Sequence, residues 1–239
     1  MPEAASPATA EQAKHPQHAH WVGLLTFASG GVDVVTLMMI GGAFTSVITG
    51  NLIFVGRAIG TTSLTPAVHA VLAVAGYIAG VAAGSRLRVL FGRDRPALLQ
   101  PWPPSATQVL AAECALLAAL NVAWIGYGAA PPAFATDLML TAAAIALGMQ
   151  GAAVRGIKGN PSTTYMTGAL TALVEALSTG RHRSADASAV VGLVALVAGA
   201  ACGAVLIRHA TRAALLPPLA ALLLVVAVKL WQHRREARA

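Results

Sequence analysis

Six long apolar segments constrain the fold of this chain more than any other feature. They are residues 21–42, 66–91, 105–127, 133–157, 186–209 and 213–231. A helix needs roughly 20 apolar residues to cross the hydrocarbon core of a bilayer, and each segment has about that length. The sequence therefore predicts an all-α integral membrane protein with about six transmembrane helices.

The composition agrees with this class and argues against a soluble domain. Hydrophobic residues make up 56% of the chain, charged residues make up 10%, and the mean hydropathy is +0.69. A soluble domain carries about 25% charged residues. The net charge of +7 comes from Lys and Arg in short clusters between apolar runs. Such clusters hold loops on the cytoplasmic side, so we expect a lipid bilayer as partner and no nucleic acid.

Two further segments, residues 44–59 and 163–179, are shorter and more polar than the six spans. Each follows a break in the apolar pattern, Gly41-Gly42 before the first and Gly159-Asn160-Pro161 before the second. We expect both to be short re-entrant or broken helices. Residues 1–20 are polar, with no apolar core before a small-residue cleavage site, and they are expected to form a disordered tail.

An internal repeat links the two short segments. Residues 45–52 (TSVITGNL) resemble residues 163–170 (TTYMTGAL), a shift of 118, and residues 79–84 (AGVAAG) resemble residues 198–203 (AGAACG), a shift of 119. The preserved spacing predicts two halves of one design. The expected organisation is a tail (1–20), a first membrane repeat (21–127), a connector (128–132), a second membrane repeat (133–231) and a basic C-terminal tail (232–239).

Four motifs suggest a family. They are Gly31-Val32-Asp33, Thr49-Gly50-Asn51, Met149-Gln150 and the run from Ser162 to Gly168. Over about residues 21–231 the chain resembles the YoaK-like bacterial membrane proteins, a family defined by a domain of unknown function. The resemblance implies about six spans and a bacterial inner membrane, and it gives no substrate. Gly151 departs from the pattern, because an Asn is expected after the Gln.

The distribution of basic residues predicts the topology. If both short segments re-enter and the N-terminus is cytoplasmic, thirteen of the sixteen Lys and Arg lie inside, and Arg57, Arg208 and Arg212 lie outside. If both short segments span, the basic residues divide equally. A rival with an external N-terminus and one re-entrant segment separates the charges almost as well. The repeat favours the first arrangement, because two segments related by a repeat are expected either both to re-enter or both to span.

This topology gives each half three spans and one re-entrant helix. Because three is odd, the second half is inverted relative to the first. Inverted repeats with a short or broken helix at corresponding positions are the recurring plan of secondary transporters, with the site near the midplane. The sequence therefore predicts a small-solute secondary transporter, by analogy of architecture.

Hydroxyl groups at the starts of the two short helices are the candidate binding groups. Helix N-termini carry unpaired N–H groups and about half a positive charge, which suits an anion or a carbonyl-bearing solute. The alternative is that these groups cap or link helices. The candidate substrate-binding residues are Thr45, Ser46, Thr49, Asn51, Gln150, Thr163, Thr164 and Thr167.

Asp33 is the candidate proton-coupling residue. It lies in the middle of the first span beside Gly30-Gly31, where an ionised carboxylate costs at least about 2.5 kcal/mol. The alternative is a structural hydrogen bond to the interrupted backbone. Glu113 and Asp137 lie nearer to helix ends, and the expectation for both is solvation at the membrane interface.

Other function classes have weaker support. The sequence holds no Walker loop, no zinc-spaced His or Cys cluster and no Gly-x-Ser-x-Gly elbow, so we expect no enzyme, cofactor or metal. The alternatives to a transporter are a non-transporting membrane scaffold and, with less support, an intramembrane enzyme using Asp33. Gly76, Gly80 and Gly84 repeat every fourth residue and predict a helix-packing face, with a homodimer contact as its second use.

Overall fold

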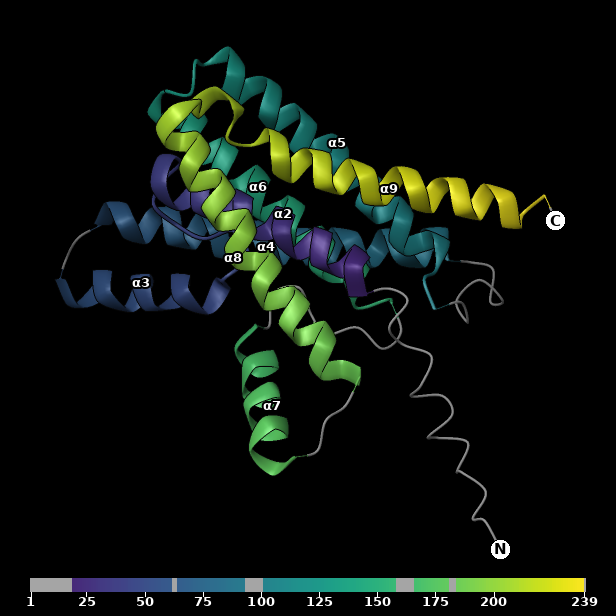
Figure 1. The fold of residues 1–239 in the computed structure, drawn as a ribbon. Helices are drawn as coiled ribbons and strands as arrows, with labels where there is room; N and C mark the ends of the chain where they lie inside the picture. The colour runs from purple at the N-terminus through teal and green to yellow at the C-terminus, as the bar shows by residue number, and fades with distance from the viewer. Residues whose placement is uncertain (1–18, 62–63, 93–100, 158–165, 181–183, 239) are drawn as a thin grey trace, which may run out of the picture.

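The computed structural model describes residues 19–61, 64–92, 101–157, 166–180 and 184–238, and these are largely helical (Figure 1). The elements are α2 (Ala19–Met39), α3 (Ile48–Thr61), α4 (Leu64–Phe91), α5 (Pro104–Gly126), α6 (Ala133–Val154), α7 (Met166–Thr179), α8 (Ser184–His209), a 3-10 turn (Thr211–Ala213) and α9 (Leu216–Glu236). Within the described residues, six stretches are long and apolar enough to span a membrane, and they lie in α2, α4, α5, α6, α8 and the 3-10 turn with α9. The prediction of an all-α membrane fold with about six spans is confirmed.

The two short segments form α3 and α7, each of 14 residues. At about 1.5 Å per residue such a helix is shorter than the roughly 30 Å hydrocarbon core. α2 ends at Met39 because Gly41 and Gly42 take positive φ angles of 81° and 68°, a conformation that favours glycine. The chain then runs as a loop to Ile48, so α3 begins four residues later than predicted.

The ends of the chain depart from the predicted organisation in one respect. α9 continues through the expected C-terminal tail as far as Glu236. The predicted N-terminal tail falls almost wholly on residues 1–18, outside the described residues. The predicted connector at 128–132 lies between α5 and α6, where Gly128 and Ala129 take positive φ angles of 65° and 64°.

The long helices pack mainly against helices of the other predicted half. The first helix of each half lies along the third helix of the other, α2 along α8 and α4 along α6. Likewise α5 packs on α6 and α9 packs on α2. Within the halves α3 packs on α4 and α7 packs on α8, and Figure 1 shows both short helices outside the central group. Each of these contacts has its counterpart at the repeat shift. α2 and α6 are the most buried spans, whereas α4 and α8 leave most of their apolar surface free for lipid.

Glycines make both long helix crossings close, and they do so at equivalent places. In each pair below, a Cβ on the glycine would overlap a backbone carbonyl of the facing helix. The pairs are Gly30 with Leu196, Gly148 with Tyr77, Gly80 with Ile145, and Gly199 with Phe27. Residues 30 and 148, 80 and 199, 27 and 145, and 77 and 196 are each separated by the 118 or 119 residues of the sequence repeat. The repeat is therefore a repeat of helix contacts as well as of sequence.

The predicted homodimer contact through Gly76, Gly80 and Gly84 is wrong. All three glycines are buried against α6 of the same chain, where Cβ atoms would meet Thr141, Ile145 and Ala152. Their four-residue spacing does mark a packing face, as expected for small residues in membrane helices. That face is occupied within the chain, so it is not available to a second copy.

Candidate functional site

Asp33 is the centre of a buried polar cluster that joins α2 to the loop before α3. Its Oδ1 accepts hydrogen bonds from the backbone N–H of Thr45 (2.6 Å), the Thr45 hydroxyl (2.8 Å) and the backbone N–H of Ser46 (2.9 Å). Its Oδ2 accepts one from the Ser46 hydroxyl, at 2.5 Å. All three residues are buried. Four donors therefore surround one carboxylate, which is how a buried anion can be satisfied without a cation.

A second contact fixes the same loop from the other side. The Asn51 amide donates to the Phe44 carbonyl at 2.6 Å and its Oδ1 accepts from the Phe44 N–H at 3.0 Å. Asn51 lies in the first turn of α3 and is fully buried. The Phe44 ring stacks on Phe54, with centroids 6.1 Å apart. The loop is thus tied to α2 through Asp33 and to α3 through Asn51.

These bonds define what Asp33 does in this structure. The side chain accepts hydrogen bonds from backbone N–H groups of the loop between α2 and α3. This is the structural role that the sequence offered as the alternative for Asp33. Thr45 and Ser46 precede α3 instead of forming its first turn, and both hydroxyl groups are directed to Asp33. A proton-coupling role for Asp33 stays a prediction.

Gln150 lies close to this cluster, on the other central helix. Its Nε2 donates to the Leu25 carbonyl (3.1 Å) and to the Ser29 hydroxyl (2.8 Å), so it links α6 to α2. Ser29 is one turn before Asp33 on α2. The structure therefore brings Gln150 and the Asp33 cluster to neighbouring turns of one buried helix.

The remaining predicted binding residues are not part of this cluster. Thr49 on α3 and Thr167 on α7 are exposed at the surface of the protein. Thr163 and Thr164 lie outside the described residues. Whether Thr49 and Thr167 line a common solute site stays a prediction.

The second predicted half has no carboxylate at the position equivalent to Asp33. Gly151 is the residue 118 positions after Asp33, and a Cβ there would lie 2.8 Å from the Tyr77 hydroxyl oxygen. The space next to the backbone is thus taken by a side chain of α4. The two halves share their helix contacts but differ in the polar group at this position.

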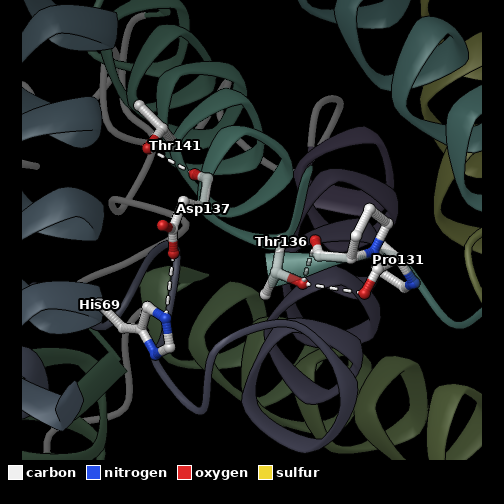
Figure 2. A network of polar contacts seen from close by, with 6 residues as sticks. His69, Pro131, Thr136, Asp137 and Thr141 are labelled. Atoms are coloured by element: carbon white, nitrogen blue, oxygen red, sulfur yellow. Dashed lines mark hydrogen bonds and ion pairs between the residues drawn. The ribbon is translucent and has the colours of Figure 1, made fainter. Parts of the chain in front are cut away.

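The Asp137 carboxylate has a partner that sequence reasoning missed. Its Oδ1 lies 3.0 Å from Nε2 of His69, and its side chain is 44% exposed. Figure 2 shows this pair joining α4 to the first turns of α6, where the Thr141 hydroxyl also donates to the Asp137 carbonyl at 2.8 Å. Solvation of Asp137 at the membrane interface stays a prediction, and His69 is a protein partner beside it.

A lysine near the end of α9 was also missed as a buried group. Lys229 is 4% exposed, its ammonium nitrogen lies 4.5 Å from the ring centroid of Trp102 and 5.3 Å from that of Trp21, and it donates to Gln232 at 3.2 Å. A cation over indole rings is stabilised by the ring electrons. Because Trp side chains favour the membrane interface, this cluster is placed to anchor the ends of α2, α5 and α9 there.

The six long apolar helices, the two short helices packed on them and the buried loop anchored by Asp33 define a multi-pass, all-α membrane protein. The chain belongs to the family described as "Protein of unknown function (DUF1275)", whose model matches residues 22–228. It is 31% identical over 162 residues to the UPF0700 transmembrane protein YoaK of Bacillus subtilis (strain 168), and the aligned region covers 66% of each protein. No solved structure matches it. The resemblance to the YoaK-like family is thereby confirmed.

Proposed function

We propose that this protein is a small-solute secondary transporter of the bacterial inner membrane, built from two inverted repeats, and not an enzyme. The observation that carries the proposal is the exchange of helix contacts between the halves, with α2 on α8 and α4 on α6. The close crossings at Gly30 and Gly148, and at Gly80 and Gly199, support a two-fold relation between the halves. Three spans in each half invert the second half relative to the first.

Inverted repeats with a short helix in each half are the architecture of many secondary transporters. α3 supports this plan, because the loop before it is held inside the protein by Asp33 and Asn51. α7 is its counterpart in length and in sequence. A helix that starts inside the membrane directs the positive end of its dipole to that depth, which favours an anionic or carbonyl-bearing solute. Thr49 and Thr167 stand in the first turns of the two helices.

The proposal is tested by ligand-dependent stabilisation of the purified protein. A panel of small anions and metabolites is screened for a rise in melting temperature, since a ligand at 100 times its Kd stabilises the folded state by about 2.7 kcal/mol. For a solute that raises the melting temperature, Thr49→Val and Thr167→Val are expected to weaken binding about 5-fold or more. Each substitution replaces a hydroxyl group with a methyl group of nearly the same shape. Thr171→Val is the matched control, since its exposed hydroxyl only bonds back to Thr167 of its own helix.

Uptake of the same solute into proteoliposomes completes that experiment. Binding without uptake would favour a receptor, and a panel with no hit and no uptake would favour the non-transporting scaffold. If all three valine substitutions weakened binding equally, Thr49 and Thr167 would not be part of the binding site.

The topology is tested separately. In a background with Cys114 and Cys202 replaced by alanine, single cysteines at Thr62 and Ala130 are expected to react with an impermeant reagent from outside. A cysteine at Asp94 is expected to react only from the cytoplasmic side. The opposite pattern at any of the three would contradict the predicted topology, whatever the solute screen shows.

A further inference from the structure

A second buried carboxyl group lies far from the Asp33 cluster. Glu113 is the tenth residue of the 23-residue helix α5 and is 0% exposed. In the described part of the chain, neither of its side-chain oxygens has a hydrogen-bond partner. The expectation that Glu113 is solvated at the membrane interface is therefore wrong, because packing closes over a position close to the middle of the helix.

Among the described residues, no cation forms an ion pair with Glu113. α5 packs on α4, α6, α9 and the 3-10 turn that holds Arg212, and the buried side chains one turn from Glu113 on α5 are Val109, Leu110 and Leu117. The titratable groups of the facing helices lie mainly toward the helix ends. They are His69, Tyr77, Arg86 and Arg88 on α4, Asp137 and the adjoining Arg155 on α6, and Lys229, His233, Arg234, Arg235 and Glu236 on α9. Cys114 is the adjacent residue on α5 itself.

Two of these groups have partners of their own. His69 pairs with Asp137, and Lys229 lies over Trp102. No ion pair to Glu113 is found among the described residues.

The two buried carboxyl groups therefore differ in kind. Asp33 receives four hydrogen bonds, two of them from backbone N–H groups, and suits the ionised form. Glu113 receives none, and an ionised carboxylate without a partner or water is very costly in such a place. A bound proton removes the charge. On the same helix, the buried Ser105 hydroxyl and the Asn121 Oδ1 also have no hydrogen-bond partner among the described residues.

We propose that Glu113 is a proton-binding site of this protein. Its carboxyl group holds a proton while α5 is packed against α6 and α9. When these helices separate, water reaches the group, its O–H bond breaks, and the proton passes to water while the carboxylate is hydrated. The use of this proton to drive a solute rests on the proposed transport function, whereas the binding of the proton does not.

The test is infrared spectroscopy of the full-length protein in lipid nanodiscs near neutral pH. A protonated carboxyl group gives a carbonyl stretching band that is separate from the bands of carboxylates and amides. The wild type is expected to show this band, with a small shift in heavy water. Glu113→Gln, which keeps the shape and cannot bind a proton, is expected to abolish it, and Asp33→Asn is the matched control that keeps it.

Several outcomes would overturn the proposal. They are absence of the band in the wild type, its persistence in Glu113→Gln, and its loss in Asp33→Asn alone, which would assign the proton to Asp33. If Glu113→Gln does not fold, Glu113→Asp replaces it and is expected to move the band. An unmoved band in Glu113→Asp would equally count against Glu113.

The readout needs no solute, so it is independent of the transport experiment. If transport is found, Glu113→Gln is expected to lose at least 10-fold in accumulation driven by a pH gradient while keeping downhill exchange of the same solute. If no transport is found, the infrared band still decides whether Glu113 binds a proton.

Discussion

Replacement of Asp33 with alanine is expected to destabilise the protein by about 2–6 kcal/mol, because it leaves the buried N–H groups of Thr45 and Ser46 without acceptors, at about 1–3 kcal/mol each. The loop between α2 and α3 should open first, since Asp33 is its bond to α2. The measurement is thermal unfolding in detergent, with hydrogen exchange of residues 40–47 as the local readout.

Asp33→Asn separates hydrogen bonding from charge. The amide oxygen can still accept from Thr45 and Ser46, and the Ser46 hydroxyl can rotate to accept from the amide nitrogen. We expect a smaller loss of about 1–2 kcal/mol, because neutral hydrogen bonds replace charge-assisted ones. Asp137→Ala serves as control, since that carboxylate is 44% exposed and should change stability by less than about 1 kcal/mol. If Asp33→Ala were no worse than Asp137→Ala, Asp33 would not hold the loop.

The spans could be predicted from the sequence because length and hydropathy alone determine which segments can cross a bilayer. The start of α3 could not be predicted as well. Thr45 and Ser46 are good helix-capping residues, and the sequence predicts them in the first turn of the helix. In the structure their hydroxyl and N–H groups are drawn to Asp33, twelve and thirteen residues earlier in the chain. That contact depends on how the loop folds back, which local propensity does not encode.

Glu113 shows a different limit of prediction from the sequence. It is the only charged residue in the segment 105–127, and its place near the midpoint was a usable signal. Whether such a residue is solvated or buried depends on which helices cover α5, and one sequence does not give the neighbours of a helix. The same limit explains the error on Gly76, Gly80 and Gly84, whose spacing predicted a packing face without saying that α6 would occupy it.

Alanine at Gly80 or at Gly199 is expected to destabilise the protein by at least about 1–3 kcal/mol, the usual cost of overpacking. The added methyl group would overlap the Ile145 carbonyl in the first case and the Phe27 carbonyl in the second. Neither carbonyl can move without shifting a whole helix, since each belongs to helical backbone. The measurement is the melting temperature of the purified full-length protein, together with the folded yield.

Gly56→Ala is the matched control, because a Cβ there meets nothing within 4 Å. In α3 it should raise stability by about 0.5–1 kcal/mol, through the better helix propensity of alanine. The two crossings are equivalent in the repeat, so Gly80→Ala and Gly199→Ala should also cost nearly the same. A large loss at one position and none at the other would mean that only one crossing holds the bundle, and the two-fold relation behind the proposed transport mechanism would lose its structural support.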